Sequence, residues 1–438
     1  MLTRLSHSRS PTPLSGLTLG ISLAVALAAC TPDLGASSGD GGAGGGATSA
    51  TSSSAGGTDP GDPLANLPAP KLPTPMLSYA AKLPASFETP LVHGYDDTAE
   101  GNPTTDAGAT LGRVLFYDRR LSANGKVACA SCHQQKHGFS DDRAKSLGFE
   151  GKETARHSMP VLDTRFYRRG KFFWDERADS LEAQVLGPIQ SDVEMGMKLD
   201  ALESRLAQTD YYAPLFKAAF GDETVSRERI ARALSQFLRS MVSYRSRWDA
   251  AMAQVDSIVG DLPGFSEAEN RGKQIFFGQH DPSTRGLCGT CHLMQNELSF
   301  TPPGAPKPPG SNAAIFYMGA PANNGLPNNA DKGVGAISGL AKDDGKFKSP
   351  SLRNVALRPP YMHDGRFKTL AEVVEHYNSG IAADPNLDPA LRQGAPNGPP
   401  MKLGLSEDDK AALVAFLMTL NDATLATDVR LSDPFPAP

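Results

Sequence analysis

Two short motifs of the same kind constrain this 438-residue chain more than any other feature of its sequence. The first reads Cys-Ala-Ser-Cys-His at 129–133, and the second reads Cys-Gly-Thr-Cys-His at 288–292. Only one of the five cysteines, Cys30, lies outside them. A disulfide within either pair would close a loop of a few residues and would stabilise the fold little. In a zinc site made of two such pairs, the pairs usually lie about 15 to 20 residues apart. The two pairs of this chain are much farther apart in sequence.

The histidine after each second cysteine favours a third chemistry. Cys-x-x-Cys-His is the attachment signature of c-type haem, in which both thiols bind the porphyrin covalently and the imidazole is the proximal iron ligand. The sequence therefore predicts two covalently bound haem c groups. One would be held by Cys129, Cys132 and His133, and the other by Cys288, Cys291 and His292.

The flanks of the two motifs repeat as well. Residues 111–133 align with residues 271–292, because in each a glycine and a basic residue precede an apolar turn, a loop and the haem motif. Such self-similarity indicates two copies of one unit, and 438 residues exceed the size of a single ordinary core. We expect an N-terminal haem domain at 76–255 and a C-terminal haem domain at 256–438.

Helical signals surround both motifs, and no segment shows convincing strand alternation. Residues 226–244 predict an amphipathic helix, in which Met241 is expected to be a core residue rather than a ligand. Capping patterns mark three further helix starts, at Ser266, Thr369 and Ser406. The 43 Gly and 35 Pro favour irregular connections. The predicted fold is all-α, with two cytochrome c-like haem domains and long irregular loops.

The first 75 residues indicate export and tethering. Residues 1–30 combine early arginines with an apolar run too short to span a bilayer comfortably. This run ends in Leu-Ala-Ala-Cys, which resembles the lipobox of bacterial lipoproteins and implies lipidation of Cys30; an uncleaved anchor is the alternative. Residues 31–75 are a Gly/Ser/Ala/Pro tether that cannot bury enough apolar surface to fold. We expect a periplasmic or cell-envelope lipoprotein, at the outer membrane because Thr31 is not the aspartate associated with inner-membrane retention.

Two longer segments carry a family resemblance. RHSMPVLDTRFYRRGKFFWDERADSLEAQVLGPIQSDVEMG lies between the haem motifs at 156–196, and KSPSLRNVALRPPYMHDGRFKTLAEVVEHYNSG follows them at 348–380. With the haem motifs, these segments resemble the bacterial di-haem cytochrome c peroxidase family, including its MauG-type branch. The resemblance covers roughly residues 76–422. It implies that the first haem reacts with peroxide, while the second stores and relays electrons.

The resemblance also implies three catalytic side chains. Peroxide cleavage needs a group that takes a proton from one oxygen and delivers it to the other. In the family this group is the glutamate of EMG, here Glu194, assisted by the glutamine of LEAQ, here Gln184. Trp174 in FFWDER matches the tryptophan between the haems, where its ring can relay an electron. Taken alone, such a Glu would be a solvated surface acid and such a Trp a core residue.

The resemblance implies that the two irons differ in coordination. The second haem needs a sixth ligand, which is a methionine in most peroxidases of the family and a tyrosine in the MauG branch. The matching position holds Tyr377, and Met362, Met401 and His376 are the alternatives.

Many relatives close the first haem with a loop histidine, which residues 146–155 lack. His157 lies next to this loop, at a position where some relatives place an asparagine that helps to bind calcium. We hypothesise a five-coordinate first haem. A calcium ion between the haems would bind through backbone carbonyls near Pro360.

Three functions are compatible with these features. The first is reduction of hydrogen peroxide to water, with electrons from a small cytochrome c or a cupredoxin. The second is a MauG-like oxidase that modifies Trp or Tyr of a partner protein, and the third is a non-enzymatic di-haem electron carrier. Glu194, Gln184 and the missing loop histidine argue against the carrier. A net charge of −5 without a basic stripe argues against a nucleic-acid partner. Contact with a membrane is expected only through the lipid. The resemblance also implies that the protein can form a homodimer.

Overall fold

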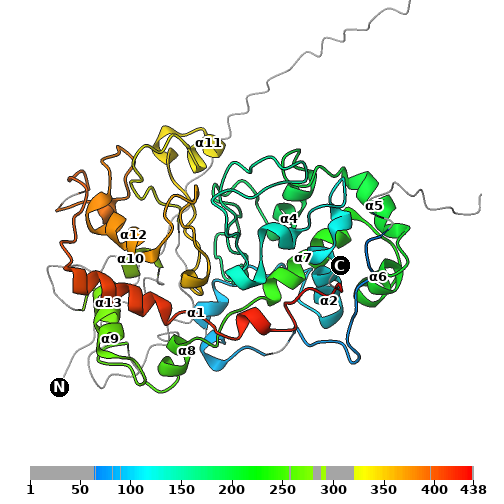
Figure 1. The fold of residues 1–438 in the computed structure, drawn as a ribbon, viewed down its shortest axis with the longest axis horizontal. Coiled ribbons are helices and arrows are strands. Elements are labelled where there is room, and N and C mark those ends of the chain that lie inside the picture. Colours follow the sequence, from blue (N-terminus) through cyan, green and yellow to red (C-terminus); the bar gives the residue numbers. More distant parts are fainter. Residues whose placement is uncertain are drawn as a thin grey trace, which may run out of the picture. The chain divides into compact units, whose positions relative to one another are not determined.

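Helices are the regular secondary structure of the described part of this chain (Figure 1). The computed structural model describes residue 64 and residues 66–80, 82–88, 90–255, 258–279, 288–292, 320–394 and 396–436. All of them fall within one unit, Thr58–Pro438. In these ranges extended pairing is limited to isolated bridges, such as the one between Gln134 and Ser140. The all-α prediction is confirmed.

The α-helices are short and are joined by long irregular segments. In the first part of the chain they are α1 (Pro90–His93), α2 (Asp106–Tyr117), α3 (Cys129–Cys132), α4 (Leu181–Gln190), α5 (Leu199–Ala207), α6 (Tyr212–Phe220) and α7 (Arg227–Ser240). In the second part they are α8 (Arg247–Met252), α9 (Glu267–Phe276), α10 (Cys288–His292), α11 (Val334–Ser338), α12 (Leu370–Glu375) and α13 (Glu407–Met418). A π-helical turn, η7 (His376–Gly380), continues α12.

The capping patterns in the sequence mark real helix starts. The side chain of Ser266 accepts a hydrogen bond from the Glu269 backbone, and Thr369 does the same for Glu372. Ser406 caps α13 in the same way. Each cap satisfies a backbone N–H that the first helical turn leaves without an intrahelical partner. Met241 lies just past the end of α7 and is fully buried in the core, as expected.

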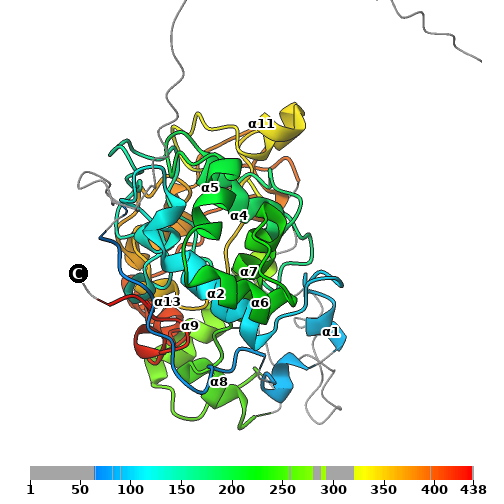
Figure 2. The same cartoon turned by 90° about the vertical axis from the view of Figure 1, so that its right-hand side faces the viewer.

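The first hydrophobic core forms where α2 packs against α7, with α4 and α6 beside them (Figure 2). Leu111 and Phe116 of α2 meet Leu234 and Phe237 of α7 in this cluster. Gly112 allows the two helices to approach closely, because a Cβ there would lie 2.0 Å from the Ala233 carbonyl oxygen. The first haem motif follows α2 along the chain, after the 3-10 turn η2 (Arg119–Leu121).

The second hydrophobic core repeats this arrangement with α9 and α13. Phe276 and Phe416 pack with Trp248 of α8, which is fully buried. Gly272 is the glycine that corresponds to Gly112, and a Cβ there would lie 1.9 Å from the Ala412 carbonyl oxygen. The repeated glycine therefore marks a close helix crossing in each half.

The basic residue after each glycine is also buried, and it holds a distant segment. Arg113 donates from Nε to the Ser432 carbonyl at 2.7 Å, and Lys273 donates from Nζ to the Ile258 carbonyl at 2.6 Å. Buried charged groups require such partners. The repeat thus encodes both the crossing of two helices and the attachment of a loop.

The two cores do not divide the chain at one point. After α13 the chain returns to the first core, where Leu425 and Leu431 are buried (Figure 1). Tyr117 of α2 donates to the Leu431 carbonyl at 2.5 Å. Near the other end, Arg120 donates to the Pro68 carbonyl at 3.3 Å, so the chain contacts the first core before residue 76. The proposed boundaries at 75/76 and 255/256 stay predictions.

Candidate functional site

A cavity of about 440 Å³ contains the first cysteine pair. Its wall includes Cys129, Cys132 and His133 together with Glu194 and Gln184. The sequence places these groups up to 65 residues apart, from 129 to 194. The structure brings the predicted haem-attachment residues and the two predicted proton-handling residues into one cavity.

His133 is oriented for a metal through its own backbone loop. Its Nδ1 lies 3.2 Å from the Phe139 carbonyl oxygen, which leaves Nε2 for another partner. Phe139 presents this carbonyl from a left-handed conformation with φ 57°. Such a hydrogen bond fixes the tautomer and the orientation of a ligating imidazole.

Glu194 lies in a turn that follows α4, and close backbone packing fixes this turn. Phe149 donates from its backbone to the Glu194 carbonyl at 2.9 Å. A Cβ on Gly148 would lie 1.6 Å from the Val193 carbonyl oxygen, so only glycine allows this approach. Burial raises the pKa of the Glu194 carboxyl, while the Arg177 charge acts in the opposite direction. A carboxyl with a raised pKa is suited to both taking up and releasing a proton.

A partition separates the first cavity from the second. Four residues line both cavities: His157, Pro160, Trp174 and Lys348. Trp174 is 9 % exposed, and its indole Nε1 donates to the His157 carbonyl at 2.7 Å. Its ring also lies edge-on to His363 at 6.4 Å. The predicted relay residue therefore stands between the two sites that it is expected to connect.

Both ring nitrogens of His157 are engaged within the protein. Nδ1 lies 2.9 Å from the Arg143 carbonyl oxygen, and Nε2 lies 3.1 Å from Ser140 Oγ. Its backbone N–H donates to the His363 carbonyl at 2.8 Å. This arrangement connects three segments around Trp174 and leaves His157 no spare nitrogen for an iron. It supports the hypothesis of an open first haem.

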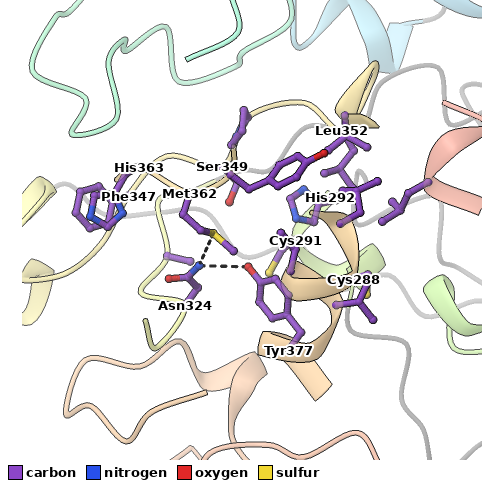
Figure 3. A pocket seen from close by; sticks show the side chains of 18 of the residues that line it. Cys288, Cys291, His292, Asn324, Phe347, Ser349, Leu352, Met362, His363 and Tyr377 are labelled. Carbon is purple, nitrogen blue, oxygen red and sulfur yellow. Dashed lines mark hydrogen bonds between the residues drawn. The ribbon is translucent and has the colours of Figure 1, made fainter. Parts of the chain in front are cut away.

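The second cavity, of about 190 Å³, contains the second cysteine pair (Figure 3). Cys288, Cys291 and His292 of α10 line it with Tyr377 of the turn η7. His292 Nδ1 is buried and has no hydrogen-bond partner among the described residues. An imidazole buried in this way is suited to an interaction with a bound group rather than with another protein residue.

Tyr377 and Met362 share one amide. Asn324 donates to the Tyr377 hydroxyl oxygen at 3.3 Å and to Met362 Sδ at 3.5 Å (Figure 3). Burial raises the pKa of Tyr377 to about 12, and the Asn324 hydrogen bond acts in the opposite direction. His376 Nε2 lies 3.0 Å from the Asn324 carbonyl oxygen and is not part of the cavity wall. The candidates for the sixth ligand therefore stay Tyr377, Met362 and Met401. His376 instead contacts the Asn324 backbone.

The residues present fit two haem c groups. None of the four motif cysteines forms a disulfide. Burial raises the pKa of each of these cysteines. Each pair lies beside a histidine, as haem c attachment requires. Each also lies in the wall of a largely apolar cavity, as is typical of cofactor sites.

Other expectations have less support. Cys30 and the export signal lie outside the described residues. No helix in the described ranges is long and apolar enough to cross a bilayer. Within the same ranges, no cluster of three or more His, Cys, Asp or Glu could hold a metal ion. Carbonyl-bound calcium near Pro360 stays a prediction.

Sequence reasoning missed most of the polar residues of the cavity walls, and Asn324 and Lys348 are two examples. Asn324 lies in a stretch without a recognisable motif, and only the structure brings it to Tyr377. Lys348 begins one of the segments that carry the resemblance, but its type and spacing gave no sign that it is buried between the two cavities.

Known proteins resemble this chain in sequence. Residues 106–257 match the family model described as di-haem cytochrome c peroxidase. The chain is 32% identical over 344 residues to the methylamine utilization protein MauG of Methylophilus methylotrophus, covering 78% of this chain and 88% of that protein. It is 31% identical over 340 residues to the cytochrome-c peroxidase IdrP2 of Pseudomonas sp. (strain SCT), covering 75% of this chain and 84% of that protein.

Solved structures resemble it in fold. A MauG-like protein associated with microbial copper homeostasis superimposes with a TM-score of 0.60 at 31% identity, covering 77% of this chain and 96% of that one. The diheme peroxidase BthA from Burkholderia thailandensis gives a TM-score of 0.58 at 23% identity, covering 78% and 93%. The second likeness concerns the fold alone.

Proposed function

This chain belongs to the di-haem cytochrome c peroxidase family, whose cofactors are haem c groups, and we propose that it reduces hydrogen peroxide to water. Electrons would come from a small cytochrome c or a cupredoxin and enter at the second haem. The observation that carries this proposal is the presence of Glu194 and Gln184 in the cavity of the first cysteine pair. An electron carrier would have no use for a desolvated carboxyl beside its cofactor.

The chemistry consumes one peroxide, two protons and two electrons and forms two waters. A haem held by Cys129, Cys132 and His133 would supply the iron that binds peroxide and exchanges the electrons. Glu194 in its carboxylate form accepts the proton of the nearer peroxide oxygen. It then returns this proton to the farther oxygen, which leaves as water. Gln184 lies in the same wall and orients the peroxide through its amide.

Trp174 connects the two sites in this proposal. Its indole N–H is fixed by the His157 carbonyl, and its ring forms part of both cavity walls. A ring held in this way can pass an electron from the second haem to the first without moving. Tyr377 is the proposed sixth ligand of the second haem, because its hydroxyl lies in the same cavity as His292.

The test compares Glu194→Gln with Glu150→Gln, a control in the neighbouring loop whose carboxylate pairs with Lys152 at the surface. Steady-state peroxide consumption is measured with reduced cytochrome c as the donor. Removing the proton-transfer group should lower kcat by about 10²- to 10⁴-fold, and the control should retain full activity. Equal activity of the two variants at unchanged haem content would contradict the assignment.

A MauG-like oxidase is the second candidate. Two observations favour it: the phenol of Tyr377 lies at the second cysteine pair, and MauG proteins are among the relatives. Rapid peroxide turnover with cytochrome c supports the peroxidase. Slow turnover with cytochrome c, combined with peroxide-dependent oxidation of Trp or Tyr in a co-purifying protein, would favour the oxidase instead.

We also propose that the chain is exported and anchored through a lipid on Cys30. The support is the Leu-Ala-Ala-Cys sequence that ends the apolar run. Cell fractionation of the wild type and of Cys30→Ser should find the first in the membrane fraction and the second released or unprocessed. A wild-type protein without lipid in mass spectra would overturn this proposal.

A further inference from the structure

Lys348 is a buried cation in the partition between the two cavities. The residue is 7 % exposed, lines both cavities and donates from its backbone N–H to the Trp174 carbonyl at 2.8 Å. The other partition residues, His157, Pro160 and Trp174, are uncharged or weakly basic. Among these four residues, Lys348 is therefore the one whose side chain can bring a positive charge to both cavity walls.

The ammonium of Lys348 faces aromatic rings rather than a carboxylate. It lies 3.7 Å from the ring centre of Tyr167 and 4.7 Å from that of Phe172, and it donates to the Lys171 carbonyl at 3.3 Å. These contacts stabilise a cation without neutralising it. When Lys348 is protonated, its positive charge is therefore not cancelled by a directly bonded carboxylate.

Two carboxylates, Glu176 and Asp97, act on Lys348 through space. Glu176 is already paired, because both of its oxygens accept hydrogen bonds from Arg169. The carboxylate of Asp97 is buried and has no hydrogen-bond partner among the described residues, but it forms an ion pair with Arg239 Nε at 3.6 Å. Asp97 is therefore the less tightly paired of the two carboxylates that act on Lys348.

We propose that Lys348 is a positioning charge that raises the reduction potentials of both haems, with Asp97 opposing it. Reduction adds an electron to each haem, and a buried positive charge stabilises that electron more strongly than a solvated one does. Because Lys348 belongs to both cavity walls, one residue shifts both potentials in the same direction. This makes both haems better acceptors for the electrons of a donor protein. The inference rests on the two-haem assignment and not on peroxide turnover.

Two substitutions of opposite sign test the proposal. Lys348→Met removes the charge and keeps an unbranched chain, and Asp97→Asn removes the opposing charge with little change of shape. The midpoint potentials of both haems are measured by spectroelectrochemical titration at pH 7.5. At this pH both groups are charged in large part, because burial raises the pKa of Asp97 to about 7 and lowers that of Lys348 to about 8. We expect both potentials to fall in Lys348→Met and to rise in Asp97→Asn.

The controls separate charge from packing. Lys346→Met removes a lysine two residues away that pairs with Asp343 at 3.0 Å, and it should leave both potentials unchanged. Lys348→Arg keeps the charge and should retain the wild-type potentials. If Lys348→Met does not incorporate two haems, Lys348→Gln removes the same charge with a polar side chain and should lower both potentials.

Unchanged potentials in Lys348→Met, a shift of one haem only, or shifts of the same sign in Lys348→Met and Asp97→Asn would overturn the proposal. The titration uses no peroxide. A protein without peroxidase activity that nevertheless shows the opposite shifts would therefore retain this inference and lose only the proposed function.

Discussion

Single residues with left-handed backbones gather around the functional side chains. Phe139 faces His133 with φ 57°, Phe173 and Glu176 flank Trp174 with φ 68° and 57°, and Met362 precedes His363 with φ 76°. Each such conformation costs a non-glycine residue about 1–3 kcal/mol. This cost is offset by the surrounding structure, as expected where the geometry serves a site.

The raised pKa of Glu194 predicts the acid limb of the pH profile. Burial favours the neutral carboxyl, so the carboxylate that accepts a proton is lost at a higher pH than for an exposed glutamate. We expect kcat/KM to fall as the pH decreases through this raised pKa. Arg177→Met removes the charge that lowers the pKa, and the limb should move to higher pH. A limb that stays in place or moves to lower pH would contradict this role of Glu194.

The assignment of Tyr377 as the sixth ligand of the second haem can be tested by spectroscopy. If its oxygen binds the second iron, Tyr377→Phe should change the optical and EPR signals of that haem in the ferric protein. Met362→Leu and Met401→Leu should leave the signals unchanged.

His157→Ala should not alter the coordination of the first haem, because both ring nitrogens already have protein partners. A low-spin first haem that is lost in His157→Ala would refute the open-site hypothesis.

Helices and loops position the functional residues through close backbone contacts. In each half, a glycine on the helix before the haem motif allows a second helix to cross at short distance. The loop 146–155 uses Gly148 in the same way, against the turn that carries Glu194. Secondary structure alone would not position that turn.

Gly148→Ala tests how this loop contributes. A Cβ would collide with the Val193 carbonyl, so the turn must shift and Glu194 must move with it. We expect kcat to fall by about 10²-fold, as displacements near 1 Å can cause, with unchanged haem content. Gly101→Ala is the matched control, because nothing lies within 4 Å of its Cβ position. Full activity of Gly148→Ala would show that the loop does not fix Glu194.

At the scale of the whole molecule, the end of the chain stabilises the first core. Leu431 is 6 % exposed and packs with residues of α2 and α7, far from it in sequence. Leu431→Ala should lower the free energy of unfolding by about 2–4 kcal/mol. Val429→Ala should change it by less than about 0.5 kcal/mol, because Val429 is 62 % exposed. Chemical denaturation of both variants provides the measurement, and equal stability would contradict the assigned packing.

The sequence by itself predicted the haem attachment points and determined the all-α class and several helix starts. These features depend on residues within a few positions of one another, such as Cys129 with His133 or Ser266 with Glu269, so local chemistry is sufficient. The tertiary structure alone decided which distant residues share a cavity wall. His157, Lys348 and Asn324 acquire their surroundings from segments that no local pattern connects, and Leu431 returns to a core begun at α2. Burial and charge depend on what folding brings into contact, and for these residues the contacts span a large part of the chain.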